Sequence, residues 1–429
     1  TLLLPYFEVD PSGAGENTVV AITNASDTAI VAHVTVWSNW SFPVLDFNLY
    51  LTGYDVVTMS LRELLVSGNI PNTGHVTSIS PVGVRSRTDA SSAASPVRLV
   101  APYNPLAATC STAQGGNGAV PSFLLSQIQS GLTGGPYSAG GVACGQVGDV
   151  SDNMVGYITF DTSAVCSQSL PTDAVYFATE IRWENQLVGD YIRLNDVDGV
   201  AGGSPMVHIQ ALPGGDSTPV TTLEWTFYNR YQSGVGVIDR RQPLPALFAA
   251  RYIEAGVSFD TDFVVWREGV TDQVGTLLCN TVLPDNASFP YVEIVRFDER
   301  ENPTTRQGGC QVSPCPPNIG LSETQILNVN NSSYIPTDPS SDAGGWVYFN
   351  LSIPEGDPLG WGRPSQNWVQ IRMTGAGLYG VDFDAAYLGN GCQYFVGVTY
   401  PSGGNGTAIP GEKIGPKYEG GTSLGWIGN

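Results

Sequence analysis

Charged side chains are scarce in this chain, and lysine is almost absent. Charged residues make up 13% of the 429 positions, well below the average of about 25%, and the only lysines are Lys413 and Lys417. The 39 acidic residues outnumber the 18 basic ones, which gives a formal net charge of −21. Because such a chain repels phosphate backbones, we expect it to bind no nucleic acid.

Residue types that commonly carry catalysis are few, and their motifs are missing. A triad of the serine type would have to use His33, His75 or His208. Residues 421–425 match G-x-S-x-G, but the acid and the histidine that should follow the serine are absent. The chain has no phosphate-binding loop and no H-E-x-x-H motif. These absences favour a protein without enzymatic activity.

Long apolar runs are missing as well. No stretch reaches the length of about 18 apolar residues that a spanning helix needs, so we expect no membrane span. The sequence opens at Thr1 without a basic segment, which we interpret as the sign of a signal peptide already removed. We therefore predict a protein that is extracellular or at the cell surface, secreted after signal-peptide removal.

The cysteines are spaced in a way that argues against zinc. No C-x-x-C pair exists, and too few histidines are present to complete a ligand set. In a secreted chain, disulfide bonds are the better interpretation, with their pairing left open. The predicted disulfide cysteines are Cys110, Cys144, Cys166, Cys279, Cys310, Cys315 and Cys392.

Turn-forming residues and alternating patterns indicate a β-rich chain. It contains 51 glycines and 30 prolines, as short-stranded sandwiches and barrels do. Segments 32–37, 45–51 and 347–353 alternate apolar and polar residues, which is typical of antiparallel strands with one wet face. Short helices are expected only at 61–66 and 121–130. The predicted fold is all-β: antiparallel β-sandwich domains of jelly-roll or immunoglobulin-like type, with long Gly/Ser-rich loops.

A change of composition near residues 239–245 suggests two domains. We predict an N-terminal β-sandwich domain over 1–240, with a cysteine-containing loop insertion at about 85–170, and a C-terminal β-sandwich domain over 241–429 with a polar, Gly-rich tail. No internal repeat is evident in the sequence.

The first nine residues, TLLLPYFEV, are unusually apolar. The start of a domain is normally polar and frayed, so this segment needs cover. It is either the first strand of its own domain or a strand donated to a neighbouring subunit, which would build a filament. The residues that would make this assembly contact are Leu2, Leu3, Leu4, Tyr6, Phe7 and Val9.

Several segments are familiar in combination. They are LLLPYFEVD, NTVVAITNAS and VLDFNLYLTGYDVVTMSLRELL, followed later by VRFDERENP, GWVYFNLSI and YGVDFDAAYL. Together they resemble a family of secreted bacterial proteins of uncharacterised function with β-rich sequences, and the resemblance spans most of the chain. It implies secretion and β architecture, and it transfers no catalytic or binding residue.

One acidic turn suggests calcium. The segment NDVDG, beginning at Asn195, offers oxygen ligands ahead of a turn glycine, as calcium loops do. Asn195, Asp196 and Asp198 are therefore predicted Ca2+ ligands, and this Ca2+ is the one cofactor that the sequence suggests. A turn stabilised by an Asx hydrogen bond is the alternative interpretation.

Carboxylate pairs and exposed tryptophans would suit carbohydrate chemistry. Glu180 and Glu184 are expected on one face of a strand, about 13 Å apart, too far for a glycosidase pair. Asp382 and Asp384 would share a strand face more closely. The tryptophans that could stack on sugars are Trp37, Trp40, Trp361 and Trp368.

Three functions stay open at this point. The first is an extracellular structural protein, a subunit of a filament, sheath or surface assembly whose partners are copies of itself. The second is a secreted carbohydrate-binding or carbohydrate-degrading β-sandwich protein, with glycans as partners. The third is an adhesin-type binding module.

The chain would also be a glycoprotein if its N-x-[S/T] sequons are used; these begin at Asn24, Asn39, Asn286, Asn330, Asn331, Asn350 and Asn405.

Overall fold

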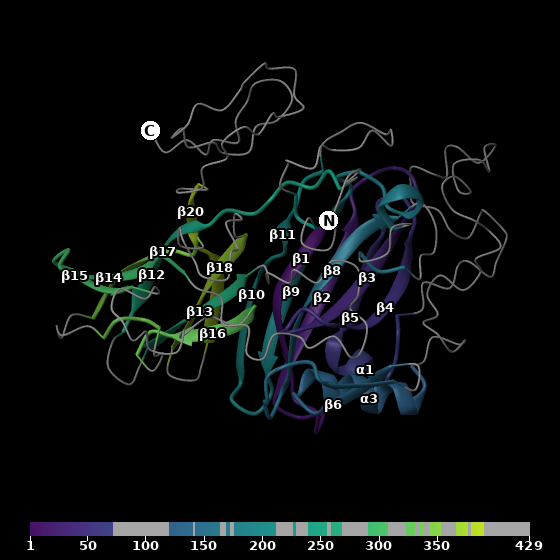
Figure 1. Cartoon of the computed structure of the whole chain (residues 1–429), viewed down its shortest axis with the longest axis horizontal. Helices are drawn as coiled ribbons and strands as arrows, with labels where there is room; N and C mark the ends of the chain where they lie inside the picture. Colours follow the sequence, from purple (N-terminus) through teal and green to yellow (C-terminus); the bar gives the residue numbers. More distant parts are fainter. Residues whose placement is uncertain are drawn as a thin grey trace, which may run out of the picture. The chain divides into compact units, whose positions relative to one another are not determined.

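The chain forms two compact units, each built almost entirely from β-strands (Figure 1). The first unit has Thr1–Asp198 and Gly203–Ser217 as its main segments, and the second has Thr218–Val274 and Val282–Asn429. The predicted all-β, sandwich-type fold is confirmed. The computed structural model describes residues 1–71, 120–139, 142–163, 169–171, 176–211, 226–228, 239–254, 259–267, 291–307, 323–330, 334–337, 343–352, 366–375 and 379–389.

Nine strands form the two sheets of the first unit. They are β1 (Leu2–Val9), β2 (Glu16–Asn24), β3 (Ile30–Ser38), β4 (Pro43–Leu51), β5 (Val56–Ser60), β8 (Met154–Ser163), β9 (Leu187–Asn195), β10 (Val200–Pro205) and β11 (Val207–His208). The five-stranded sheet has the order β11-β1-β8-β3-β4, and the four-stranded sheet has the order β10-β9-β2-β5. Leu2 of β1 packs toward β9, since its Cδ1 lies 3.0 Å from the Cβ position of Gly189. The two sheets therefore enclose a common core.

Between β5 and β8, the residues that the structure describes include two helices and a hairpin. Helices α1 (Leu61–Leu65) and α3 (Ser122–Leu132) confirm the two short helices expected from the sequence. The hairpin is β6 (Pro136–Ala139) with β7 (Val142–Gln146), and a π-helical turn, η4 (Tyr176–Glu180), follows β8. Cys144 on β7 is disulfide-bonded; the other six cysteines, most of the Gly/Ser-rich loops and the C-terminal tail lie outside the described residues.

Nine strands also form the two sheets of the second unit. They are β12 (Leu247–Ile253), β13 (Phe259–Arg267), β14 (Glu293–Asp298), β15 (Pro303–Gln307), β16 (Thr324–Asn328), β17 (Gly344–Asn350), β18 (Asn367–Gly375), β19 (Tyr379–Asp384) and β20 (Ala386–Gly389). The five-stranded sheet has the order β15-β14-β17-β12-β20, and the four-stranded sheet has the order β16-β13-β18-β19. Their shared core contains Phe248, Phe263, Val347, Phe349 and Ile371.

The two units share one topology, although no repeat is evident in the sequence. In chain order, β1 to β5 correspond to β12 to β16, and β8 to β11 correspond to β17 to β20. With this correspondence, the two five-stranded sheets have the same strand order, and so do the two four-stranded sheets. The repeat is hidden because the segment between β5 and β8 is far longer than the segment between β16 and β17.

A glycine on the central strand supports this correspondence residue by residue. Gly156 on β8 and Gly345 on β17 face the neighbouring strand so closely that a Cβ would overlap its backbone. The overlapped atom is the carbonyl oxygen of Trp37 on β3 in one unit and that of Phe297 on β14 in the other. Only glycine fits at either position, because real Cβ atoms are not found at such distances from backbone oxygen.

A buried threonine also recurs in both units. The Thr18 hydroxyl donates to the carbonyl oxygen of Glu8 and accepts from its N–H, both at 3.2 Å. The Thr261 hydroxyl makes the same two bonds with Ile253, at 2.9 and 3.0 Å. Each hydroxyl thereby ties the end of one strand to the strand of the opposite sheet that follows it. The two units therefore share contacts as well as strand order.

The expected wet strand face is absent at the centre of the first unit. Every residue of β3 and β8 is buried, because the sheet face turned away from the sandwich core is covered too. On that face, Tyr176 of η4 packs edge-on against His33 of β3 and donates a hydrogen bond to Asp161 of β8, the cross-strand partner of His33. The period-two pattern predicted the strands correctly but not the cover over their polar side.

Alanine at the shared glycine position should destabilise either unit. We expect Gly345→Ala to lower the free energy of unfolding by about 3 kcal/mol, because β14 and β17 would have to separate to admit the Cβ. Gly199→Asn is the control: its Cβ position has no atom within 4 Å, and asparagine tolerates the left-handed backbone, so the cost should stay below about 1 kcal/mol. Denaturant unfolding monitored by calorimetry or fluorescence measures both, and equal costs would contradict the close-approach explanation.

Candidate functional site

The predicted calcium ligands form the turn between β9 and β10. Asn195 Oδ1 accepts hydrogen bonds from the backbone N–H groups of Val197 and Asp198, at 3.0 and 2.9 Å, which is an Asx turn. Arg62 pairs with Asp196 at 2.6 Å, and Asn195 Nδ2 donates to Asp198 at 2.8 Å. All three predicted ligands thus have protein partners that account for the turn, and calcium binding stays a prediction.

The residues predicted to make an assembly contact form β1 of their own unit. β1 lies between β8 and β11, and every residue of Leu2–Val9 except Glu8 is buried. The cover that this apolar segment needs is therefore present within the first unit. Exchange of the strand with a neighbouring copy stays a prediction.

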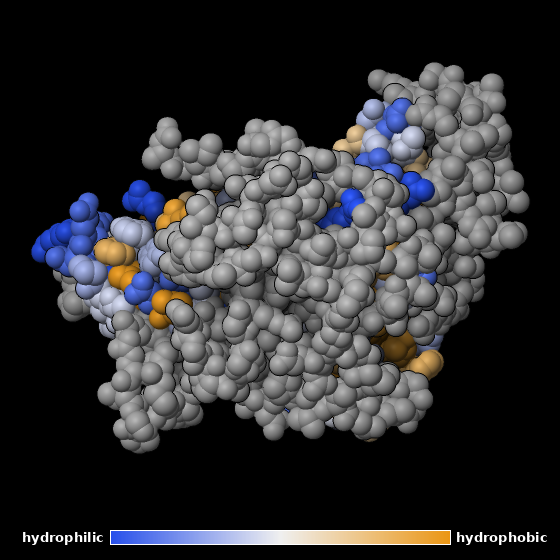
Figure 2. Space-filling model, turned by 45° about the horizontal axis from the view of Figure 1, so that its top comes forward, coloured by the Kyte–Doolittle hydropathy of each residue, from blue (hydrophilic) through white to orange (hydrophobic). Residues whose placement is uncertain are grey.

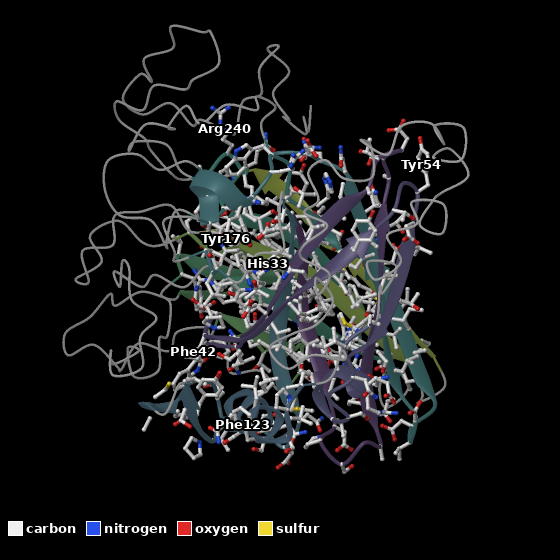
Figure 3. All side chains as sticks on the ribbon, turned by 90° about the vertical axis from the view of Figure 1, so that its right-hand side faces the viewer. His33, Phe42, Tyr54, Phe123, Tyr176 and Arg240 are labelled. Atoms are coloured by element: carbon white, nitrogen blue, oxygen red, sulfur yellow. The ribbon has the colours of Figure 1, made fainter. Side chains whose placement is uncertain are left out.

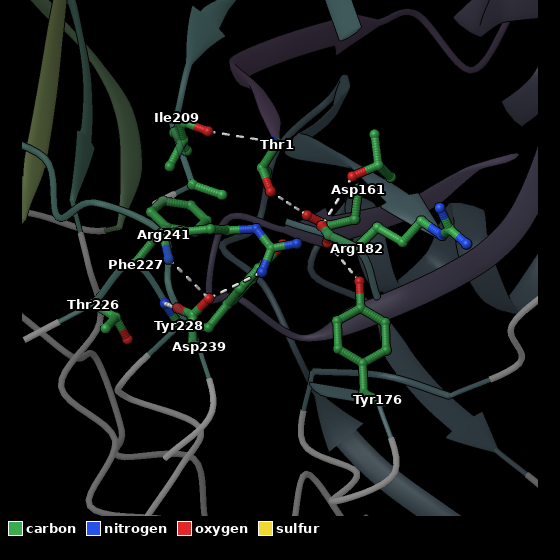
Figure 4. Close-up of polar contacts among 12 residues, drawn as sticks. Thr1, Asp161, Tyr176, Arg182, Ile209, Thr226, Phe227, Tyr228, Asp239 and Arg241 are labelled. Atoms are coloured by element: carbon green, nitrogen blue, oxygen red, sulfur yellow. Dashed lines mark hydrogen bonds and ion pairs between the residues drawn. The ribbon is translucent and has the colours of Figure 1, made fainter. Parts of the chain in front are cut away.

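A polar cluster fixes the start of β1 (Figure 4). Asp161 of β8 is completely buried and accepts hydrogen bonds from the hydroxyl groups of Thr1 and Tyr176. The Thr1 amino group donates to the carbonyl oxygen of Ile209 at 3.2 Å. A carboxylate can be buried only with such donors, because the loss of hydration costs several kcal/mol. We call Thr1, Asp161 and Tyr176 the Asp161 cluster.

His33 lies beside this cluster (Figure 3). Its ring meets Tyr176 edge-on with the centroids 5.7 Å apart, and its Nδ1 lies 3.1 Å from Asn48 Oδ1. Because the amide oxygen only accepts, this hydrogen bond requires a proton on Nδ1. Nε2 has no hydrogen-bond partner, so His33 activates no serine or threonine hydroxyl in this structure. His75, the second candidate, lies outside the described residues.

The segment around Glu180 and Glu184 is not a strand, contrary to the sequence-based expectation. It begins with η4, and Arg182 then pairs with Glu184 at 3.1 Å on the surface. The turn places the Tyr176 hydroxyl on Asp161, and a hydrogen bond to a buried carboxylate outweighs the modest strand preference of the segment. These two carboxylates therefore do not share a strand face.

The second carboxylate pair lies on β19. Asp384 accepts hydrogen bonds from Trp368 Nε1 and Gln370 Nε2, both at 3.1 Å, whereas Asp382 is buried. The two carboxylates thus differ in environment, and one of the predicted sugar-stacking tryptophans is engaged by Asp384.

An aromatic ridge lies on the outer face of the five-stranded sheet of the second unit. Phe297 of β14 and Trp346 of β17 are direct cross-strand partners, and their rings stack with centroids 4.1 Å apart and planes 6° from parallel. Tyr348 follows on the same face, because side chains alternate along a strand and Val347 and Phe349 belong to the core. We define the aromatic ridge as Phe297, Trp346 and Tyr348, all of which are partly exposed.

On the β12 side, the ridge is flanked by one charged and one small residue. The β12 partner of Trp346 is Arg251, which is exposed, and the β12 partner of Tyr348 is the small Ala249. Because Phe297 covers one face of the Trp346 ring from β14, the other ring face turns toward β12. Figure 2 shows hydrophobic and hydrophilic residues next to one another at its left end, where Figure 1 places β12, β14, β15 and β17.

The corresponding aromatic pair of the first unit is closed to solvent. Trp37 and Tyr157 stack with centroids 5.8 Å apart and planes 7° from parallel, yet both rings are 0% exposed. Trp37 Nε1 donates to the Thr159 hydroxyl at 2.9 Å, and the Tyr157 and Ser41 hydroxyls are hydrogen-bonded at 2.6 Å. Of the two equivalent pairs, only the one in the second unit is partly exposed to solvent.

The ridge was not predicted from the sequence, where Tyr348 was expected on the polar face of a strand. A usable signal was present in GGWVYFN (344–350), where two alternate positions, 346 and 348, hold large aromatic residues instead of the usual polar ones. The four tryptophans predicted to stack on sugars are buried, engaged by carboxylates or outside the described residues: Trp37, Trp40, Trp361 and Trp368.

Comparisons with known proteins add no name to this site: no family model matches the chain, and no curated protein or solved structure matches it either. Among the described residues, no group of three or more His, Cys, Asp or Glu side chains could hold a metal ion. No helix within the same residues is long and apolar enough to span a membrane.

The Asp161 cluster should contribute more to stability than a neutral hydrogen bond of the same unit. We expect Tyr176→Phe to lower the free energy of unfolding by about 1.5–3 kcal/mol, because it removes a donor from a buried carboxylate. Tyr157→Phe is the matched control, since its hydroxyl is hydrogen-bonded to the neutral hydroxyl of Ser41 and its loss should cost about 0.5–1.5 kcal/mol. Urea unfolding of both variants shows which one loses more free energy of unfolding. A larger loss for Tyr157→Phe than for Tyr176→Phe would contradict the prediction.

Proposed function

We propose that this protein is a secreted, glycan-binding β-sandwich protein and that the aromatic ridge is its contact surface for sugar. The observation that supports this is the stacked Phe297–Trp346 pair on a solvent-facing sheet surface. Aromatic rings offer flat apolar faces and bury a large area on contact. Contiguous exposed apolar surface commonly marks a binding site, and the C–H faces of pyranose rings match aromatic rings in shape and polarity.

The charge of the chain favours a neutral glycan over an anionic one. The net charge of −21 repels polyanions at long range. Close to the ridge, the exposed Arg251 guanidinium can donate hydrogen bonds to sugar hydroxyls. Glu293, four residues from Phe297 on the same face of β14, can accept them. Neutral polyols use both kinds of partner, whereas an anionic polymer would be repelled by the carboxylate.

The proposal is for binding and not for hydrolysis. Glycosidases need two carboxyl groups on either side of the scissile bond. On the outer face of β14, the side chains are Glu293, Val295 and Phe297, which supply a single carboxyl group. An adhesin-type binding module on a cell surface is the broader form of the same proposal, since it would use the same ridge with a glycan carried by another cell.

Removal of the ridge tryptophan should weaken glycan binding. We expect Trp346→Ala to reduce retention on insoluble neutral polysaccharides about tenfold or more, because the variant loses the stacking surface. The probes are microcrystalline cellulose, chitin and insoluble β-1,3-glucan, tested with purified full-length protein in a depletion assay.

Trp40→Ala serves as the control for this assay, because Trp40 is a partly buried tryptophan of the other unit that donates to Asp149 at 2.9 Å. It should leave retention unchanged, and thermal unfolding confirms that both variants are folded. Binding of Trp346→Ala at the wild-type level would contradict the proposal. A change in molecular mass without a change in retention would assign the ridge to contacts between copies instead.

A further inference from the structure

The outer face of the five-stranded sheet in the second unit is closed at one end of the ridge. On β17, Trp346 and Tyr348 are partly exposed, but the next residue on this face, Asn350, is buried. Its β12 partner, Leu247, is buried as well. Before this buried row lies a group of residues from β17, β12 and β20 that are at least partly exposed. We call them the open patch: Trp346, Tyr348, Arg251, Ala249 and Ala386.

The uncovered face of the Trp346 ring determines how a sugar can lie on this patch. Phe297 and Trp346 are cross-strand partners, and their rings are nearly parallel with centroids 4.1 Å apart. The ring normals therefore follow the line from β14 to β17, which leads on to β12. A pyranose ring that stacks on Trp346 must lie parallel to it. The plane of the sugar then stands on the sheet and follows the strand direction.

This orientation limits the path of a glycan chain. In glycans with equatorial linkages, the chain leaves each pyranose ring roughly in the plane of that ring. A chain stacked on Trp346 would thus follow β12 or lead away from the sheet, and it would not cross the strands. Along β12, the open stretch from Arg251 to Ala249 measures about 7 Å, and the buried Leu247 comes next. The chain therefore has to end above Ala249.

Small residues leave room for that terminal sugar, and a cation lies beside it. Ala249 is the cross-strand partner of Tyr348, and Ala386 of β20 is the partner of Ala249 on the other side. Arg251 is exposed, and none of the described residues forms an ion pair or a hydrogen bond with its side chain. Its N–H groups are available to sugar hydroxyls, and a terminal sugar offers more free hydroxyls than an internal one.

We infer that the open patch binds the terminal sugar of a neutral glycan chain, stacked on Trp346 above Ala249, and that the small size of Ala249 makes this position accessible. The inference deepens the proposed function and rests on it, because it takes the ridge as the surface that contacts sugar. The ligand class is then a glycan chain end, free or as part of a polysaccharide, and not an internal segment.

Ala249→Leu tests where the sugar lies. Full-length protein is used in the depletion assay with microcrystalline cellulose, chitin and insoluble β-1,3-glucan. The added side chain should occupy the place of the sugar and lower retention about tenfold or more. Thr305→Leu is the matched control, because Thr305 is exposed on the same sheet face but beyond the ridge, opposite Val295 on β14. It should be retained at the wild-type level, and thermal unfolding confirms that both variants are folded.

Soluble oligosaccharides distinguish a chain end from an internal segment. The disaccharide and the hexasaccharide of the retained polymer, for cellulose cellobiose and cellohexaose, are compared as competitors of the unmodified protein. Because each has one end that fits the patch, both should displace the protein at molar concentrations within about fivefold of each other.

Two results would overturn the inference and leave the proposed function standing. One is a larger advantage of the hexasaccharide, which would mean that the surface binds along the chain. The other is wild-type retention of Ala249→Leu, which would place the sugar elsewhere on the ridge. If none of the three polysaccharides retains the unmodified protein, the proposed function fails and the inference fails with it.

Discussion

The outer face of each sandwich depends on one place where two neighbouring strands approach each other unusually closely. At Gly345, β17 runs so close to β14 that no side chain fits between them, and the residues next to this point, Phe297 and Trp346, are brought into a face-to-face stack. The first unit repeats the approach at Gly156. In both units the glycine permits the close approach of the two strands, and a stacked pair of aromatic rings lies directly beside it.

The two units use this shared framework differently. In the first unit, the outer face of the five-stranded sheet is covered. The buried Asp161 helps to hold η4 over this face, because it accepts hydrogen bonds from the hydroxyl groups of Thr1 and of Tyr176 in η4. In the second unit, the equivalent face stays partly exposed and carries the aromatic ridge. The repeated fold therefore has one closed face and one open face within a single chain, and the proposed function assigns glycan binding to the open one.

The sequence could predict the strands and the short helices, because period-two alternation and proline or glycine at helix ends are local signals. It could not predict the repeat, because strand order depends on pairings between distant segments and the connecting segments differ in length. Glu180 was misplaced on a strand, since the hydrogen bond from Tyr176 to Asp161 overrides local preference. The ridge was partly predictable: Trp346 and Tyr348 occupy alternate positions, but their link to Phe297 needs the β14–β17 register.

Hydrogen-exchange mass spectrometry of the unmodified protein, with and without a bound neutral polysaccharide, tests the central claim most directly. If the ridge binds the glycan, backbone amides of β14, β15 and β17 should exchange more slowly in the complex, and the covered face of the first unit should be unaffected. Protection confined to the first unit, or no protection in β14 and β17 despite measurable binding, would contradict the account.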